Sequence, residues 1–223
     1  MPTLHVLRVF CAPEGGGGNP LGVFLDGGEV EETARQGIAR DLGFSETVFV
    51  DDVARGELRI FTPAEELPFA GHPLVGTAWL LARERQPVEW LRPRAGEVPV
   101  RAEGALTYIA GRPEWAPRFE FVQAESPEEV ERLEGPPAGE DMVGVWAWLD
   151  EPAGVIRERV FVPGLGIAED EATGAAAVLL GAQLGRELDI RQGKGSRIVA
   201  TPLDNGMVEI GGRVELDDVR GYP

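Results

Sequence analysis

Two apolar helices set among many short strands constrain the fold of this chain more than any other feature. The segments "HPLVGTAWLLARER", with Pro73 in its first turn, and "TGAAAVLLGAQLGREL" are apolar on most faces. A helix that is apolar nearly all round is usually buried. Most other segments are short alternating runs separated by Gly and Pro, which predict strands. We therefore expect an α+β fold with two pseudo-symmetric halves, each a mostly antiparallel rolled sheet or barrel around a central buried helix.

Local patterns place the other elements. Apolar residues recur every four positions from Val30 to Leu42, which predicts a helix that ends at Gly43. A short helix is expected after Ser126, its N-cap. The sequence "DNG" between two alternating runs predicts a hairpin near the C-terminus. Strands are expected over 4–10, 21–27, 45–50, 56–63, 119–125, 141–150 and 154–163, with further short strands over 88–113.

A weak internal repeat predicts that the chain consists of two halves. "RIFTP" leads through a loop to "AGHPLVGTAWLL", and "RVFVP" leads through a longer loop to "TGAAAVLLGAQL", so Gly71 corresponds to Gly174 and His72 to Ala175. We predict an N-terminal half, residues 1–95, with its central helix over about 72–85. The C-terminal half, residues 96–223, has its central helix over about 173–188, and its last residues can return to the N-terminal half.

Composition argues against several classes of protein. The formal net charge of −17 disfavours nucleic acid and membranes as partners, because phosphate binding depends on clustered Lys and Arg. No apolar run reaches the roughly 18 residues of a membrane helix, and no signal peptide is evident, so we expect a cytoplasmic protein. Cys11 is the only cysteine, which excludes an intrachain disulfide and a two-thiol mechanism. Neither metal-ligand spacing nor a nucleotide fingerprint is found, so we expect no metal and no cofactor.

The starts of the two buried helices can form a binding site if they face a common cleft. Each would present unpaired backbone N–H groups and a partial positive charge to a substrate carboxylate or a developing oxyanion. Glu46 in "FSETVFV" is a candidate general base, because partial burial raises the pKa of a carboxyl; it can equally be a loop residue that bonds local N–H groups. His72 would be neutral at a helix start and able to carry a proton; it can equally be an N-cap or core histidine.

Four further residues are weaker candidates for the same cleft. Asp170 precedes the second buried helix and could position His72 or bind substrate, or it could simply complement the helix dipole. Asn19 in "GNP" has a turn as its alternative role, and Gln192 and Gly193 in "RQGKG" carry less signal still.

Taken together, these motifs resemble the phenazine-biosynthesis isomerase (PhzF) family. The stretches "GNPLGVF", "DLGFSETVFV", "RIFTPAEELPFAGHPLVGTAWLL", "EDEATGAAA" and "RQGKGSRI" occur in the order and spacing of that family, over nearly the whole chain. The resemblance implies a fold like that of diaminopimelate epimerase, with the site between two halves that each wrap a helix. It also implies proton transfer at carbon without a cofactor, on a small carboxylated substrate, and a homodimer.

The resemblance also implies roles for individual residues. Glu46 matches the family's catalytic glutamate, and His72 and Asp170 match the histidine and aspartate that assist the proton relay and orient the substrate. Gly71, Gly174 and Ala175 would offer backbone N–H groups to a carboxylate.

Departures from the family pattern keep other functions open. Ala175 stands where the family often has a serine. The cysteines of the related epimerases align with Ala70 and Thr173, so thiol racemisation is not expected. Two alternatives remain: a non-catalytic protein that binds a small acid, and a racemase or epimerase that uses Glu46 and His72 as opposing bases.

Overall fold

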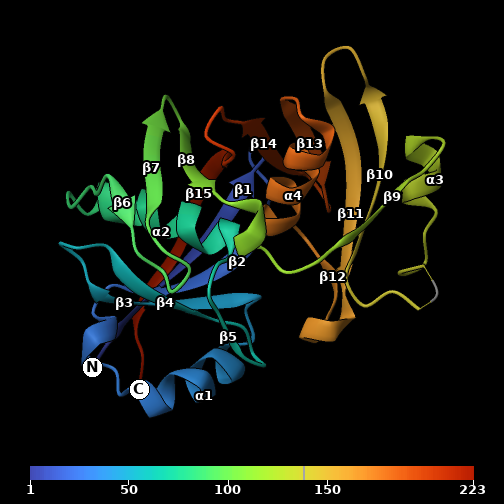
Figure 1. The fold of residues 1–223 in the computed structure, drawn as a ribbon. Helices are drawn as coiled ribbons and strands as arrows, with labels where there is room; N and C mark the ends of the chain where they lie inside the picture. Colours follow the sequence, from blue (N-terminus) through green and yellow to red (C-terminus); the bar gives the residue numbers. More distant parts are fainter. Residues whose placement is uncertain (138) are drawn as a thin grey trace.

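The computed structural model describes residues 1–137 and 139–223 (Figure 1). Fifteen strands form one connected, curved sheet, and the two apolar helices, α2 and α4, lie against it near the middle of the molecule. The α-helices are α1 (Glu32–Leu42), α2 (Gly71–Arg83), α3 (Pro127–Glu131) and α4 (Gly174–Leu184). The strands are β1 (Thr3–Cys11), β2 (Gly17–Phe24), β3 (Glu46–Asp52), β4 (Glu57–Phe61), β5 (Glu66–Leu67), β6 (Trp90–Leu91), β7 (Val98–Glu103), β8 (Leu106–Gly111), β9 (Glu120–Gln123), β10 (Val143–Asp150), β11 (Val155–Val162), β12 (Ile167–Asp170), β13 (Leu188–Gln192), β14 (Ser196–Pro202) and β15 (Val208–Gly221).

The chain contains the same structural unit twice. Strands β2 and β3 are parallel and joined through α1, and β9 and β10 are parallel and joined through α3. In each unit two antiparallel partners follow, β4 and β5 or β11 and β12, before the central helix α2 or α4. Three strands complete each unit, β6 to β8 and β13 to β15. The α+β class with two related halves is therefore confirmed, and the predicted division between residues 95 and 96 falls inside the first unit.

The two central helices are buried, as their composition predicts. In α2 the exposed fraction is 0% at Leu74, Leu80 and Leu81, and in α4 it is 0% at Val178 and Leu180. Burial of this kind stabilises a fold by about 1.5–3 kcal/mol per large aliphatic side chain. Both helices belong to one core cluster that also takes side chains from the sheet.

Helix ends follow the local signals, with one exception. Gly43 ends α1 with a φ of 66°, and the Ser126 side chain accepts a hydrogen bond from the Glu129 backbone N–H, as predicted. The second central helix, however, ends at Leu184 rather than near residue 188. Gly185 adopts a φ of 62° and its N–H donates to the Gly181 carbonyl, a left-handed cap that lets β13 begin at Leu188.

The last strand joins the two halves. The first residues of β15 pair with β8 and β14, whereas its later residues pair with β1, from Arg213 opposite Cys11 to Gly221 opposite Thr3. Both chain ends consequently lie close together at one side of the molecule (Figure 1). Within the described residues, none of the helices combines the length and apolarity that crossing a membrane would need.

Candidate active site

The two central helices meet at their first residues. A Cβ atom built on Gly71 would lie 2.7 Å from the Cα atom of Gly174, and one built on Gly174 would lie 2.9 Å from the backbone nitrogen of His72. Only glycine at both positions allows this approach. The first N–H groups of a helix have no partner within the helix, so two sets of free donors converge here.

Glu46 and His72 form a buried pair beside this junction. Glu46 begins β3, and His72 is the second residue of α2. Their exposed fractions are 9% and 2%, and the Glu46 Oε2 and His72 Nε2 atoms lie 3.3 Å apart. Neither atom has a well-aligned hydrogen-bond partner among the described residues. Buried polar atoms are rarely left in this state, so these two are candidates for contact with a ligand.

Burial changes the protonation of both groups. The pKa of Glu46 is raised well above its ordinary value, first by desolvation and second by the negative charge of Asp170. Desolvation lowers the pKa of His72 to about 3, although a hydrogen bond to the Pro20 backbone opposes this shift. His72 is therefore a neutral imidazole near pH 7. An ionised Glu46 would be a much stronger base than an exposed glutamate.

Asp170 is held by a network that joins the two halves. Its Oδ1 atom accepts a hydrogen bond from the Asn19 side-chain amide at 2.7 Å, and its Oδ2 atom accepts one from the Thr173 hydroxyl at 2.7 Å. The Ser45 hydroxyl donates to the Asn19 side-chain oxygen at 2.9 Å and lies 3.5 Å from Asp170. Desolvation raises the pKa of Asp170 to about 6, while the donors oppose the shift. The network fixes the carboxyl that raises the pKa of Glu46.

Gln192 closes the network from β13. Its side-chain amide donates to the Thr173 hydroxyl and to the Asp170 carbonyl, both at 2.9 Å. Its side-chain oxygen accepts the Thr173 backbone N–H at 2.9 Å. Gln192 has an exposed fraction of 1%, and its hydrogen bonds with Thr173 hold the start of α4.

A second connection between the halves lies next to this network. The Ser196 hydroxyl accepts the Gly18 N–H at 2.8 Å and donates to the Glu171 carboxylate at 2.8 Å. A Cβ on Gly17 would lie 2.5 Å from the Gly195 backbone, so the two turns are in close contact. Since Gly18 precedes Asn19 and Glu171 follows Asp170, this contact fixes the two residues that the Asn19–Asp170 bond joins.

The structure brings most of the predicted site residues together. Direct contacts link Glu46 with His72, Gly71 with Gly174, and Asn19, Gln192 and Asp170 with one another through the network above. Gly193 packs against Glu171, where a Cβ would lie 2.4 Å from its carboxyl carbon, and Ala175 is buried at 8% exposure. The hydrogen bonds of Asp170 run to Asn19, Ser45 and Thr173 rather than to His72.

Three hydroxyl groups were not singled out from the sequence as site residues: those of Ser45, Thr173 and Ser196. Thr173 could have been found from the sequence, since it is the N-cap residue of α4 and corresponds to Ala70 at the start of α2. Ser196 could not have been found from the sequence, because its partners Gly18 and Glu171 are distant in sequence.

Two related units whose central helices meet at their first residues, with a buried acid beside a neutral histidine, form a candidate active site of an enzyme. The chain belongs to the phenazine biosynthesis-like protein family, whose model matches residues 8–129. It is 31% identical to trans-2,3-dihydro-3-hydroxyanthranilate isomerase of Pseudomonas aeruginosa, in an alignment that covers 79% of this chain and 78% of that protein. Other relatives are also named as isomerases, and this chain is an isomerase of the same family.

Two solved structures show the same fold. A PhzF-family phenazine biosynthesis protein from Enterococcus faecalis superposes with a TM-score of 0.81 at 24% identity, covering 100% of this chain and 99% of that one. A predicted epimerase from Pseudomonas aeruginosa superposes with a TM-score of 0.77 at 25% identity, with 100% and 99% coverage.

Proposed function

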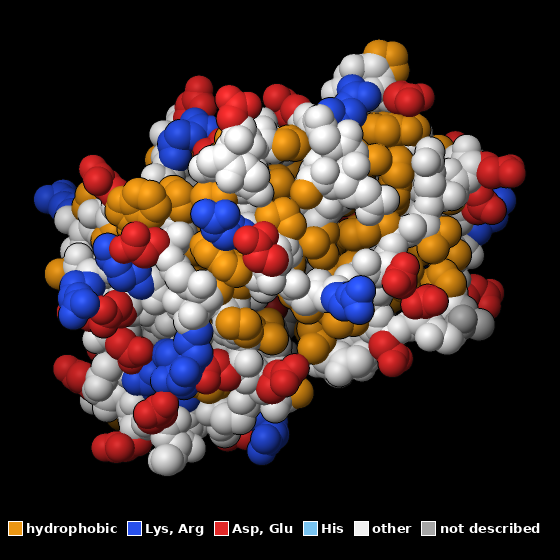
Figure 2. All heavy atoms as spheres, viewed as in Figure 1, with side chains coloured by type: hydrophobic (Ala, Val, Ile, Leu, Met, Phe, Trp, Pro, Cys, Tyr) orange, Lys and Arg blue, Asp and Glu red, His pale blue; other side chains and the backbone are white. Residues whose placement is uncertain are grey.

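We propose that this isomerase moves a proton from one carbon to another in a small, cyclic carboxylated substrate. The observation that carries the proposal is the Glu46–His72 pair, which is buried, unpartnered and placed where two helix starts meet. Figure 2 shows that acidic side chains are spread over this face of the molecule, in keeping with the formal net charge of −17.

In this proposal Glu46 performs the chemical step. Its carboxylate removes a proton from carbon, and the resulting carboxyl returns the same proton to a second carbon, so that the substrate is isomerised without a change in composition. The raised pKa of Glu46 makes the ionised form a stronger base than an exposed glutamate, and the protonated form can return the proton.

His72 acts beside Glu46 as a neutral group. A backbone carbonyl can only accept a hydrogen bond, so the ring nitrogen that bonds to Pro20 carries the hydrogen. Because Nε2 has no partner, the bonded nitrogen is Nδ1, and Nε2 carries the free lone pair. The Nε2 lone pair of His72 can thus accept a hydrogen bond from the protonated Glu46 carboxyl or from the substrate, and so position the proton during transfer.

The helix starts supply the substrate's anchor. Backbone N–H groups of Gly71, Gly174 and Ala175 would bind the carboxylate, which an acidic protein could not attract by its net charge. The relative from Pseudomonas aeruginosa is named for a substrate of this chemical class. Asp170, with Asn19 and Gln192, would orient the substrate and maintain the charge beside Glu46.

The alternatives are less well supported by the geometry. A two-base racemase needs its bases on opposite faces of one carbon, whereas the Glu46 and His72 atoms are only 3.3 Å apart and leave no room for a carbon between them. A protein that only binds an acid would have no use for a base with a raised pKa. Exchange of hydrogen at carbon separates these functions.

The test is incorporation of solvent deuterium into cyclic unsaturated carboxylic acids, followed by NMR. We expect label at one carbon with the wild-type protein and a loss of about 10²–10⁴-fold in Glu46→Gln. Glu187→Gln is the control for loss of one acidic group, because Glu187 is exposed between α4 and β13; its rate of exchange should be unchanged. Unchanged exchange in Glu46→Gln would contradict the assignment of the base.

A homodimer and a cytoplasmic location remain predictions that accompany this proposal. Analytical ultracentrifugation of the purified protein tests the first, and fractionation of cells that express it tests the second.

A further inference from the structure

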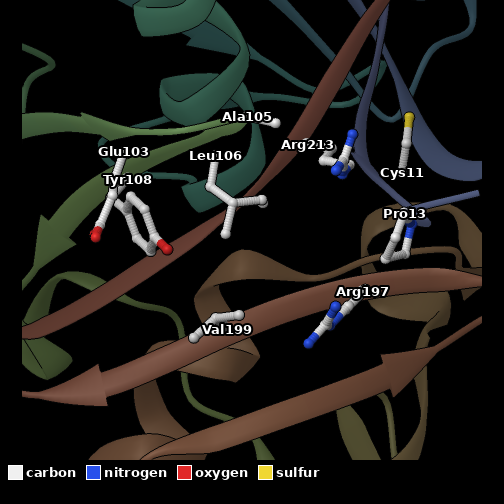
Figure 3. A pocket seen from close by; sticks show the side chains of 10 residues that line it. Cys11, Pro13, Glu103, Ala105, Leu106, Tyr108, Arg197, Val199 and Arg213 are labelled. Carbon is white, nitrogen blue, oxygen red and sulfur yellow. The ribbon is translucent and has the colours of Figure 1, made fainter.

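A cavity of about 440 Å³ lies apart from the proposed active site, at the place where β15 crosses between the halves. Figure 3 shows side chains from four different segments arranged around this space. Its walls combine apolar groups with two arginines: Leu106, Tyr108, Val199, Pro13, Arg197 and Arg213. None of the proposed catalytic residues lines it. Its volume is in the range of pockets that hold small molecules.

Arg213 is the unusual member of this wall. Arginines with restricted exposure elsewhere in the described structure pair with carboxylates or donate to carbonyl oxygens; Arg197, for example, forms a bidentate pair with Asp189 at 2.9 Å. Arg213 is half-buried and has no hydrogen bond or ion pair to any described residue. In a chain with 38 acidic residues against 21 basic ones, an unpaired half-buried guanidinium is a site prepared for an anion.

The other polar groups of the wall do not compete for Arg213. Glu103 forms an ion pair with Arg101 instead. Burial raises the pKa of the Cys11 thiol to about 11, so this group is not a thiolate near neutral pH. The positive charge of Arg213 is therefore available to a ligand, and the apolar surface of Leu106 and Val199 is available to the ligand's body.

The backbone beside the cavity is strained, which is an independent sign of a functional site. Phe10 has an exposed fraction of 0% and a φ of 71°, a value that bulky residues rarely adopt. It is left out of the β1–β15 ladder, in which Val9 faces Val214 and Cys11 faces Arg213. Such a bulge changes the direction of the side chains that follow it, and Cys11 and its partner Arg213 both line the cavity.

We propose that this cavity is a second binding site, for a small monoanion with an apolar body such as an aromatic carboxylate. The guanidinium of Arg213 binds the carboxylate, and Leu106, Val199 and the Tyr108 ring contact the body. The inference does not depend on the proposed isomerase mechanism, since the two sites share no residue.

The test uses benzoate as the probe and amide NMR of the full chain. We expect benzoate to shift the amide signals of Leu106, Val199 and Arg213, and to do so equally in the Glu46→Gln variant. Arg213→Gln should weaken this binding by about tenfold or more, as expected for loss of a charged hydrogen bond. Arg40→Gln is the matched control, because Arg40 is exposed on α1 and lies outside the cavity.

A second variant tests the cavity without removing the charge of Arg213, in case Arg213→Gln alters the fold. Ala105 is exposed on the turn between β7 and β8, so Ala105→Trp should leave the fold intact while filling the cavity mouth, and it should abolish the shifts. The proposal fails if Arg213→Gln binds benzoate like wild type, or if only the amides of Gly71 and Gly174 respond. It also fails if wild type binds no benzoate and Arg213→Gln changes its sedimentation, which would assign this face to a protein interface.

Discussion

The two structural units share their topology but place polar groups at different positions. Phe61 of β4 faces Thr47, and Phe161 of β11 faces Val143, so Glu46 corresponds to Met142. His72 corresponds to Ala175 at the helix starts, and Thr173 corresponds to Ala70. Each unit is apolar where the other is polar.

The two walls of the site also differ in how their polar atoms are satisfied. The first unit contributes Glu46 and His72, whose facing atoms have no hydrogen-bond partner in the part of the chain that the structure describes. The second contributes Asp170, Thr173 and Gln192, which bond to one another and to Asn19. Unpartnered groups are free to exchange protons, whereas satisfied groups hold their positions. The comparison teaches that the two units share one backbone frame but differ in the role of their polar residues. We call Glu46 and His72 the reacting wall, and Asp170, Thr173 and Gln192 the holding wall.

The largest expected effect comes from removing the second member of the reacting wall. His72→Asn should slow proton exchange at carbon by about 10²-fold or more, because the imidazole that positions the proton beside Glu46 is lost. His5→Asn is the matched control, since His5 lies in β1 and bonds only to the Val23 carbonyl. Deuterium incorporation measures both. Equal losses in the two variants would place His72 among ordinary core residues.

The next prediction concerns Glu158, which occupies the place that Leu58 has in the first unit. Glu158 is fully buried, neither of its side-chain oxygens has a partner among the described residues, and burial raises its pKa to about 8 from the usual 4.5. Between these values the folded state binds the extra proton, so this residue's contribution to stability falls as the pH rises. The slope should be about 1.4 kcal/mol per pH unit from about pH 5 to 8.

Glu158→Gln and Glu158→Leu should both remove that slope, and Glu158→Leu makes the second unit like the first. Urea unfolding at a series of pH values measures the free energy of unfolding. Glu187→Gln, at an exposed position, serves as the control for loss of one acidic group. A wild-type curve whose difference from Glu158→Gln does not change with pH would show that Glu158 is not protonated in the folded state.

A smaller effect is expected when Asp170, in the holding wall, loses its charge but keeps its shape. Asp170→Asn removes the negative charge that raises the pKa of Glu46, so the pKa of Glu46 should fall. Because the base must be ionised, the acidic limb of the kcat/KM profile should move to lower pH. Glu171→Gln removes a charge that acts on Asp170 but not directly on Glu46, and its limb should stay in place.

The smallest effect is expected at the contact between the halves. Ser196→Ala loses the bonds to Gly18 and Glu171 and should lower the free energy of unfolding by about 1 kcal/mol. If this contact aligns the two walls, KM should rise more than kcat falls, and Ser196→Thr should restore both. An unchanged KM in Ser196→Ala would limit the residue to stability.

The sequence by itself determined the class of fold and much of the site. Apolar periodicity identified both central helices because burial on all sides leaves no polar face. The repeated strand-to-glycine pattern located Gly71 and Gly174, since only glycine permits the close approach that the structure shows. Motif order then indicated Glu46, His72 and Asp170.

The tertiary structure alone decided how these residues are connected. Asp170 bonds to Asn19, which is 151 positions away, and Ser196 bonds to Gly18 across 178 positions; no local pattern encodes such pairs. The shifts in pKa at Glu46 and His72 come from desolvation, which depends on what packs around a residue and not on its neighbours in sequence. The same reason explains Arg213, whose lack of a partner is visible only once all other charges have been placed.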